Sequence, residues 1–411
     1  MAGAPIVVVG GGLAAAKAVE TLRDEGHDGV VVVVAREPHR PYERPPLSKD
    51  YLRGEAERDA VFPLAEDWYA RHDVELLRGA TATGVDPGGH VVTLADGRTL
   101  DYARLLIATG SDPRALPVPG ADLEGVHYLR TLEDSERLAA TFEASAREGA
   151  GRLAIVGDGW IGLEVAASAR SKGLDVSVVG RGAHPLERVL GPEMGELYGQ
   201  VHAEHGVHLH RRAEATEITG REDRVTGVAL GDGTHVEADV VLVAVGAAPN
   251  VGLAEAAGLA LDSATGGVVA SATLQTTDPD VFVAGDVASV PSPRYGRSIR
   301  VEHWATALNQ GPHAARAMLG STDPYPELPY FFSDQYDVGM EYLGFVAGPD
   351  AYDEVVVSGS LADRELVAFW TKDGRVEAGM AVNVWDRMDD VTALIHRDGP
   401  VDRAELEAFV R

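Results

Sequence analysis

Two glycine-rich segments constrain this chain more than any other feature of its sequence. The first follows an apolar run at residues 5–9 and leads into an alanine-rich stretch. Its spacing, Gly10-x-Gly12-x-x-Ala15, fits the dinucleotide fingerprint with alanine as the third small residue. The first glycine allows a tight turn, the second lets backbone approach a pyrophosphate, and free N–H groups at the helix start attract the anion. The candidate binding residues here are Gly10, Gly12, Leu13, Ala14 and Ala15.

The same pattern returns in full form later in the chain. An apolar strand is expected at residues 153–156, a helix at 163–172 and another strand at 176–179. Between the first two lies a complete Gly-x-Gly-x-x-Gly motif, with candidate residues Gly157, Gly159, Trp160, Ile161 and Gly162. One such motif is weak evidence, because glycine-rich turns often only connect a strand to a helix. Two favour a flavin dinucleotide and a nicotinamide dinucleotide on one chain, and therefore an oxidoreductase.

Three further apolar segments, at residues 105–110, 240–246 and 281–286, are typical of strands that end in small-residue turns. Open α/β sheets bind ligands at the carboxyl ends of their strands. Taken singly, each segment fits an ordinary core strand, but their order beside the two fingerprints favours a binding role. The candidates are Ala108, Thr109, Gly110, Gly285 and Asp286 for the flavin, and Gly246 for the nicotinamide nucleotide.

Composition excludes several classes of protein. The 411 residues contain no cysteine, which excludes disulfides, thiolate metal sites and cysteine-based catalysis. The formal charge of −28 argues against nucleic acid or anionic membrane as a partner. No segment approaches the roughly 20 apolar residues of a membrane span. A strand expected from Pro5 leaves no room for a signal peptide, so we expect a cytoplasmic protein.

The sequence pattern changes near residue 328. Residues 365–370 and 376–384 are expected to be strands, and residues 386–396 and 402–410 helices, the last capped by Asp402. The predicted fold is therefore α/β, with two Rossmann-like dinucleotide-binding domains of the glutathione-reductase type and a C-terminal α+β domain.

A third motif, Arg40-Pro41-Tyr42-Glu43-Arg44-Pro45-Pro46-Leu47-Ser48-Lys49, makes the chain recognisable. With it and the segments at 108–111, 157–164, 284–286, 302–305, 309–311 and 333–336, the chain resembles the ferredoxin reductases that serve oxygenases and cytochromes P450. These are putidaredoxin reductase-like FAD flavoproteins, and apoptosis-inducing factor is a more distant relative. The resemblance covers essentially the whole chain.

The resemblance implies an FAD domain at residues 1–112 and 241–322, an NAD(P)H domain at 113–240 and a C-terminal domain at 323–411. It places Lys49 beside the flavin N5, with Glu164 near both the flavin and the nicotinamide. A buried ammonium would stabilise negative charge that develops on the flavin, and a neighbouring carboxylate favours the charged ammonium. Without the resemblance, a surface lysine and a helix-face glutamate would be the simpler interpretation.

The resemblance also implies roles for other residues. Asp286 would bond the ribityl chain, Arg44 would face the FAD phosphates or adenosine, and Glu37 would replace the usual ribose-binding acid. Trp160 would cover the nicotinamide pocket. Trp304 would pack on the flavin, with a core tryptophan as the alternative, and Phe332 stands where many relatives have tryptophan. The remaining candidates for FAD contact are Pro46, Glu302 and His303.

The segment after the second fingerprint bears on the choice of nucleotide. An acid about 20 residues beyond the motif would accept the ribose 2′-OH of NADH. Here Val179 is followed by Gly180 and Arg181, and Arg188 lies close behind. We hypothesise that Arg181 and Arg188 favour the 2′-phosphate of NADPH, alongside NADH. A surface arginine in a turn is the alternative.

Four histidines, at positions 202, 205, 208 and 210, raise the question of a metal site. Gly206 separates a predicted helix end from a predicted strand, and alternation puts His208 and His210 on one face of that strand. We therefore expect a polar face and assign no metal.

The predicted mechanism is hydride transfer from NADH or NADPH to FAD, followed by single-electron transfers to a transiently bound iron–sulfur ferredoxin that supplies a cytochrome P450 or an oxygenase. The absence of cysteine argues against the dithiol and sulfenate enzymes that share two dinucleotide sites. A local basic patch of Arg294, Arg297 and Arg300 is the candidate ferredoxin-docking surface. An NAD(P)H oxidase or quinone reductase, and a redox sensor similar to apoptosis-inducing factor, remain alternatives.

Overall fold

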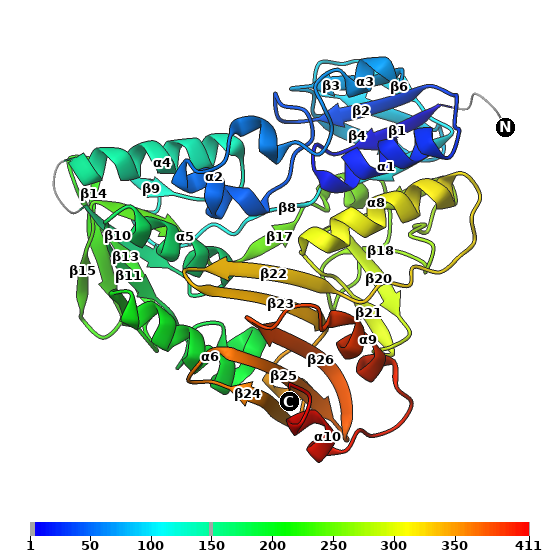
Figure 1. Ribbon diagram of the computed structural model, residues 1–411. Helices are drawn as coiled ribbons and strands as arrows, with labels where there is room; N and C mark the ends of the chain where they lie inside the picture. Colours follow the sequence, from blue (N-terminus) through cyan, green and yellow to red (C-terminus); the bar gives the residue numbers. More distant parts are fainter. Residues whose placement is uncertain (1–4, 148–150, 411) are drawn as a thin grey trace. The chain divides into compact units, whose positions relative to one another are not determined.

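The computed structural model describes residues 5–147 and 151–410 of the chain. The chain forms two compact units (Figure 1). The first comprises Met1–Glu43, Arg58–Asp112 and Ala248–Tyr330, and the second comprises Arg44–Glu57, Pro113–Ala247 and Phe331–Arg411.

The first unit is built on a five-stranded parallel sheet in the order β19-β7-β1-β2-β3. Its valine-rich strands are buried on both faces, as expected for a sheet covered by other elements. The strands are β1 (Ile6–Val9), β2 (Val31–Ala35), β3 (Val74–Arg78), β7 (Arg104–Ile107) and β19 (Val281–Val283). Two three-stranded sheets accompany it: β4 (Ala82–Asp86), β5 (Val91–Leu94) and β6 (Thr99–Asp101); and β18 (Val268–Val269), β20 (Ala288–Ser292) and β21 (Arg297–Ile299).

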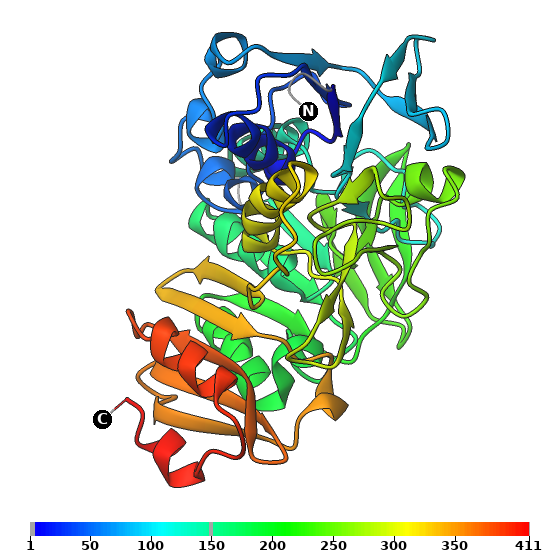
Figure 2. The same ribbon diagram turned by 90° about the vertical axis from the view of Figure 1, so that its right-hand side faces the viewer.

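Helices α1 (Leu13–Asp24) and α8 (Trp304–Met318) pack against each other in this unit, as Figures 1 and 2 show. Their contact is close because both helices present small residues: a Cβ atom added to Gly311 would lie 2.4 Å from the Ala14 carbonyl oxygen. The other helices of this unit are η2 (Arg58–Val61), α3 (Trp68–Arg71) and α7 (Gly252–Ala256).

The second unit repeats the parallel arrangement, with the strand order β12-β11-β10-β16-β9. Its strands are β9 (Val126–His127), β10 (Arg152–Val156), β11 (Asp175–Val179), β12 (Val207–His210) and β16 (Val240–Val243). A three-stranded antiparallel insertion precedes β16, as β4–β6 precede β7 in the first unit; it consists of β13 (Ala215–Arg221), β14 (Arg224–Leu230) and β15 (His235–Glu237). Its helices are η1 (Pro45–Ser48), α2 (Asp50–Arg53), α4 (Leu132–Arg147), α5 (Trp160–Ser171) and α6 (Glu187–Glu204).

The end of the chain adds a five-stranded sheet to the second unit, in the order β22-β23-β26-β25-β24. Its elements are β22 (Tyr330–Gln335), β23 (Val338–Gly344), η3 (Pro349–Ala351), β24 (Glu354–Ser360), β25 (Glu365–Lys372), β26 (Arg375–Val382), α9 (Met388–His396) and α10 (Arg403–Glu407). The chain passes between the two units within β8 (Ser111–Pro113), β17 (Ala247–Pro249) and β22.

The predicted fold class is confirmed, including the two Rossmann-like sheets and the C-terminal α+β part. Several predicted boundaries are wrong by a few residues. Helix α5 begins at Trp160 rather than at 163, because the motif glycine Gly159 already serves as its N-cap. Strand β26 ends at Val382 and helix α9 begins at Met388, while Asp402 caps α10 as predicted by accepting a hydrogen bond from the Ala404 N–H.

The contact between α1 and α8 generates a stability prediction. Gly311→Ala should destabilise the protein by about 1–3 kcal/mol, because the added methyl group must displace backbone rather than a flexible side chain. The measurement is thermal unfolding followed by circular dichroism. Gly252→Ala is the matched control, since a Cβ atom there would meet nothing within 4 Å. Equal melting temperatures for the two variants would contradict the prediction.

Candidate active site

The two fingerprints have the same local geometry. Gly10 and Gly157 have positive φ angles of 154° and 117°, and a Cβ atom on either would lie 2.2 Å from a carbonyl oxygen of a neighbouring segment, that of Ala108 or Ala244. In contrast, a Cβ atom on Gly12 would meet nothing within 4 Å. The first glycine is therefore needed for close packing, while the second leaves open space beside a helix N-terminus, where a pyrophosphate would fit.

The second fingerprint also has an open middle glycine, because a Cβ atom on Gly159 would meet nothing within 4 Å. The third glycine, Gly162, has a packing role, since its Cβ atom would lie 2.2 Å from the Gly157 carbonyl oxygen. The fingerprint residues of both units thus fit dinucleotides.

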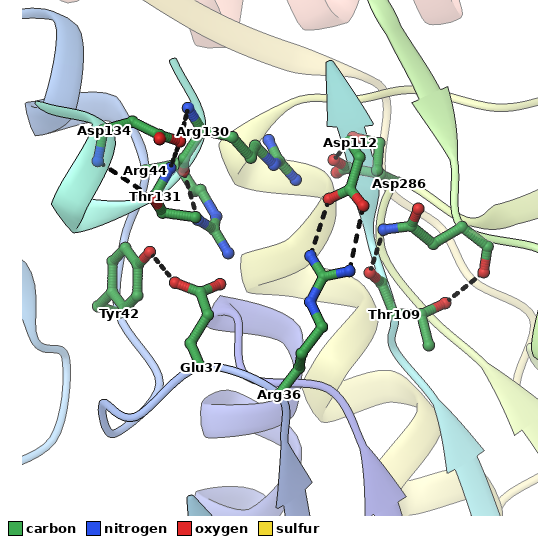
Figure 3. Close-up of polar contacts among 12 residues, drawn as sticks. Arg36, Glu37, Tyr42, Arg44, Thr109, Asp112, Arg130, Thr131, Asp134 and Asp286 are labelled. Atoms are coloured by element: carbon green, nitrogen blue, oxygen red, sulfur yellow. Dashed lines mark hydrogen bonds and ion pairs between the residues drawn. The ribbon is translucent and has the colours of Figure 1, made fainter. Parts of the chain in front are cut away.

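The carboxyl edge of the first unit's sheet collects several predicted FAD residues. Glu37, just after β2, accepts a hydrogen bond from the hydroxyl of the fully buried Tyr42 (Figure 3). The preceding residue, Arg36, forms a two-pronged ion pair with Asp112, with N–O distances of 3.0 and 3.2 Å. Glu37 is thereby fixed at the position where a ribose-binding acid is expected, and Arg36 is paired with an acid of β8.

The neighbouring strands supply the other residues of this edge. Thr109 follows β7, and its hydroxyl donates to the Asn250 carbonyl at 2.8 Å. Asp286 follows β19, and its carboxylate accepts a hydrogen bond from Ser111 at 2.6 Å. The buried Gln310 of α8 accepts the Gly285 N–H at 2.8 Å. These contacts fix the backbone of 108–110 and 284–286 at one sheet edge, beside the first fingerprint.

Residues 302–304 form the start of helix α8. Burial raises the pKa of the Glu43 carboxyl group, and the neighbouring Trp304 side chain opposes the rise. Burial lowers the pKa of His303 to about 4, with Asp286 opposing the shift, so this imidazole is neutral at pH 7. Glu302 pairs with Arg300. Trp304 is half-buried, so it remains undecided whether it packs on the flavin or is a core residue.

The second unit contains the strongest electrostatic feature of the site. Lys49 Nζ lies 3.0 Å from Glu164 Oε1, and the two side chains are only 10% and 8% exposed. Two hydroxyl groups complete the carboxylate's coordination: Ser48 Oγ donates to Oε2 at 2.5 Å and Ser333 Oγ donates to Oε1 at 2.7 Å. A buried ion pair is tolerated where further hydrogen bonds satisfy its atoms, as they do here.

Local structure explains why Lys49 is held here. Pro45 and Pro46 open the short helix η1, and Ser48 ends it. The Leu47 and Ser48 carbonyl oxygens accept hydrogen bonds from Ser135 of α4 and Ser168 of α5, at 2.9 and 2.7 Å. The turn is thus attached to two helices of the second unit.

Two aromatic residues adjoin this ion pair. Lys49 Nζ lies 5.0 Å from the centre of the Phe332 ring, within range of a cation–π contact. Trp160 makes edge-to-face contacts with Tyr198 and Phe331, with ring centres 5.5 and 5.1 Å apart. The buried Trp160 Nε1 and Tyr198 hydroxyl have no hydrogen-bond partner among the described residues. Two buried polar groups near the second fingerprint are therefore available to hydrogen-bond a ligand, as would be expected of a nucleotide site.

The loop after β11 carries the residues predicted to read the nucleotide ribose. Arg181 and Arg188 are exposed. The Glu187 carboxylate accepts the N–H groups of Ala183 and His184, at 2.7 and 3.2 Å, so an acidic side chain does reach this loop, although one of its oxygens is already bonded to backbone. The sequence pattern missed it because Glu187 lies in the following helix. Burial raises the pKa of Asp158 in the fingerprint, Glu187 adds to the rise and Arg181 opposes it.

Arg44 and Gly246 are fixed by backbone contacts within the second unit. Arg44 donates to the Arg130 carbonyl (Figure 3). Asp134 accepts the N–H groups of Arg130 and Thr131, at 3.1 and 2.8 Å, which caps helix α4. The Gly246 carbonyl accepts the Arg114 N–H at 2.9 Å.

The polar face predicted from the strand alternation of His208 and His210 does not extend to His202 in the preceding helix. This side chain is fully buried in α6, and its Nε2 lies 2.8 Å from Gln335 Oε1, because a partner on β22 satisfies it away from water. His208 is exposed near Asp175. Within the described part of the chain, no three His, Cys, Asp or Glu side chains gather as a metal ion would require.

The predicted docking arginines differ from one another. Arg300 is 13% exposed, pairs with Glu302 and donates to the carbonyl oxygens of Thr265 and Asp286. Its guanidinium is thus engaged within the first unit. Arg297 is exposed at the start of β21, and Arg294 lies over the Tyr295 ring.

Comparison with known proteins identifies the family. Residues 4–311 match the family model of pyridine nucleotide-disulphide oxidoreductases, and residues 330–408 match the model of the reductase C-terminal domain. The chain belongs to the pyridine nucleotide-disulphide oxidoreductase family. It is an FAD-dependent oxidoreductase that uses NAD(P)H, and the predicted resemblance to putidaredoxin reductase-like proteins is confirmed.

Individual relatives match over nearly the full length. The chain is 37% identical to putidaredoxin reductase of Pseudomonas putida over 383 residues, covering 92% of this chain and 88% of that protein. It is 37% identical to the ferredoxin–NAD(+) reductase component of the anthranilate 1,2-dioxygenase system of Burkholderia cepacia, covering 93% and 92%. The structure matches the reductase of a covalent putidaredoxin reductase–putidaredoxin complex with a TM-score of 0.91 and 35% identity, over 99% of this chain and 96% of that chain.

The chain departs from its family's name in one respect, since it has no cysteine and so no redox-active disulfide. Among the helices of residues 5–147 and 151–410, none is long and apolar enough to cross a bilayer.

The geometry around Asp286 generates a prediction about FAD. Asp286→Asn should weaken FAD binding about tenfold, because a hydrogen bond to a charged group contributes about 1.5–3 kcal/mol. The measurement is the Kd of FAD for the apoprotein, followed by flavin fluorescence. Asp101→Asn is the control, since Asp101 is exposed at the end of β6. Unchanged FAD affinity in Asp286→Asn would exclude the predicted hydrogen bond between Asp286 and the ribityl chain of FAD.

Proposed function

We propose that the protein is a ferredoxin reductase, which passes electrons from NAD(P)H through FAD to an iron–sulfur ferredoxin that supplies a cytochrome P450 or a Rieske-type oxygenase. The observation that carries the proposal is the buried Lys49–Glu164 pair, at the positions that the family resemblance assigns to the flavin site. The relatives support a ferredoxin as the electron acceptor. One relative is the reductase component of a dioxygenase system, and one matching structure is a reductase in complex with putidaredoxin. The expected location is the cytoplasm.

In this proposal, residues 1–112 and 241–322 form the FAD domain, residues 113–240 the NAD(P)H domain and residues 323–411 the C-terminal domain. Gly10, Gly12 and Ala15 cradle the FAD pyrophosphate, Glu37 binds the adenosine ribose and Asp286 binds the ribityl chain. Gly157, Gly159 and Gly162 cradle the nicotinamide dinucleotide.

Bound FAD supplies the chemistry that joins a two-electron hydride donor to a one-electron acceptor. The chain's residues supply the charge around it. Lys49 presents a buried ammonium that stabilises negative charge on the flavin, and Glu164 holds that ammonium in place through their ion pair. Trp160 covers the nicotinamide pocket and keeps water out.

The absence of cysteine supports direct electron transfer from flavin to an external acceptor. Related enzymes with a redox dithiol pass electrons through sulfur, and this chain has no sulfur pair to receive them.

The proposed function is tested by anaerobic titration with NADH and NADPH while flavin absorbance is followed, and by turnover with an added ferredoxin. We expect rapid bleaching by a reduced nucleotide and a turnover rate that rises with ferredoxin concentration. Equal oxygen-dependent turnover without ferredoxin would support an oxidase or quinone reductase instead. Slow reduction with a long-lived charge-transfer complex would support a redox sensor.

Nucleotide choice is tested at Arg181. We propose that this exposed side chain binds the 2′-phosphate of NADPH, so Arg181→Ala should lower kcat/KM for NADPH about tenfold and leave kcat/KM for NADH unchanged. The control is Arg221→Ala, at the hairpin turn between β13 and β14. A strong preference for NADH that Arg181→Ala does not alter would contradict the proposal.

Ferredoxin docking is tested at the exposed end of the arginine patch. The double variant Arg294→Glu, Arg297→Glu should raise the KM for ferredoxin and weaken its salt dependence, while flavin reduction by NAD(P)H stays unchanged. The reason is that screening to about 8 Å at physiological salt confines the attraction to a local patch despite the net charge of −28. Arg71→Glu, Arg98→Glu is the matched control, with both side chains exposed in the first unit. Identical ferredoxin kinetics in the two double variants would remove these arginines from the docking surface.

A further inference from the structure

The Glu164 carboxylate is the end of a longer chain of buried hydrogen bonds. Ser333 donates to Glu164 Oε1 at 2.7 Å, and Gln335 Nε2 donates to Ser333 Oγ at 3.1 Å. His202 Nε2 lies 2.8 Å from Gln335 Oε1. Ser333, Gln335 and His202 are each at most 1% exposed. Strand β22 and helix α6 thus connect a fully buried histidine to the carboxylate that holds Lys49.

The chemistry of the groups gives this series of hydrogen bonds one direction, from donor to acceptor. An ionised carboxylate only accepts hydrogen bonds, so Ser333 must donate to Glu164 and accept from the amide N–H of Gln335. The amide oxygen of Gln335 then remains to accept from His202 Nε2–H. Burial lowers the pKa of His202 to about 4, although the bond to Gln335 opposes the shift, so the ring is neutral at pH 7. Its Nδ1 faces the Tyr336 hydroxyl at 3.5 Å.

Each of the three donors, His202, Gln335 and Ser333, therefore donates in the direction of Glu164. Aligned hydrogen bonds polarise one another in a low-dielectric interior, which increases the positive potential at the carboxylate. Other ionisable groups around the carboxylate are Lys49, Tyr198 of α6 and Asp334 of β22. Burial raises the pKa of Asp334, and Lys49 opposes the rise. Burial likewise raises the pKa of Tyr198.

We propose that Gln335 and His202 are positioning residues, which orient the Glu164 carboxylate toward Lys49 and thereby set the electrostatic potential beside the flavin. The inference rests on the proposed function, because only there does the Lys49–Glu164 pair act on bound FAD. A buried polar network that merely supports the fold is the competing explanation, and the experiments below separate the two.

The first experiment reverses the hydrogen bond between Gln335 and Ser333. In Gln335→Glu, the new carboxylate has nearly the same shape but accepts from both neighbours, so Ser333 turns its proton away from Glu164. Gln335→Met keeps a similar volume and leaves Ser333 donating to Glu164. Gln200→Glu adds the same charge on the exposed surface of α6 and is the matched control. All variants are prepared as FAD-loaded full-length protein.

The readout is the midpoint potential of the bound flavin, measured by reductive titration. We expect Gln335→Glu to lower it by about 30 mV, equal to a tenfold change in the equilibrium constant of a two-electron couple. Gln335→Met, which removes the polarising amide but leaves Ser333 donating, should lower the potential by clearly less than Gln335→Glu does, and Gln200→Glu should leave it unchanged. Equal shifts in Gln335→Glu and Gln335→Met would indicate a structural role and overturn the proposal.

A double-mutant cycle with Ser333→Ala separates this route from a direct effect of the new charge. If the effect passes through Ser333, most of the shift caused by Gln335→Glu disappears in the Ser333→Ala background. Additive shifts would show that the charge acts through space, and would overturn the proposal.

The second experiment uses the unaltered protein and needs no variant to fold. Nitrogen-15 NMR of the histidine rings should show His202 as the neutral Nε2–H tautomer from pH 6 to 8. A charged ring or the Nδ1–H tautomer would reverse or break the chain of donors and overturn the proposal.

These outcomes are independent of the test of function. A flavin that NADH and NADPH fail to reduce would refute the proposed reductase activity, whereas the potential can still be measured with a chemical reductant. A readily reduced flavin with an additive cycle would refute the positioning role alone.

Discussion

The close approach of backbone to backbone at Gly10 and Gly157 is the constraint on which both dinucleotide sites depend. In each unit, the strand ends at a glycine whose missing side chain lets a neighbouring segment come to van der Waals distance. A helix can then begin three residues later, after a glycine N-cap, with its free N–H groups over open space. Because this geometry fixes where the strand ends and the helix starts, it also fixes the sheet edge on which the other site residues gather.

Much of this arrangement could be predicted because its signals are local. The glycine spacings, the β-branched runs and the small-residue strand ends each depend on a few adjacent residues. Repetition of one pattern at Gly10 and Gly157 was enough to predict two parallel sheets, and four of the five strands in each sheet have the same order. The buried Lys49 was predicted only by resemblance, since neither hydropathy nor spacing indicates that a lysine after two prolines is buried.

What the sequence did not indicate depends on contacts between distant segments. Ser48 and Ser333 meet the same carboxylate from opposite ends of the chain, and a serine carries no local signal of such a partner. The burial of His202 likewise depends on a distant segment. Its neighbours in α6 and β12 suggested a polar surface, but Gln335 of β22 provides a buried partner. Glu187 was overlooked because its carboxylate reaches back to the loop from the following helix.

The second unit is formed by three separate stretches of the chain. The Glu164 carboxylate belongs to the second stretch, and its partners come from the other two: Ser48 and Lys49 from the first and Ser333 from the third. A chain emerging from the ribosome therefore makes Lys49 early and Glu164 about a hundred residues later, yet lacks the Ser333 hydroxyl until the last fifth of synthesis. During that interval the carboxylate lacks one of its three donors. The order of translation thus delays completion of this buried charged centre until the residues of both parallel sheets have been made.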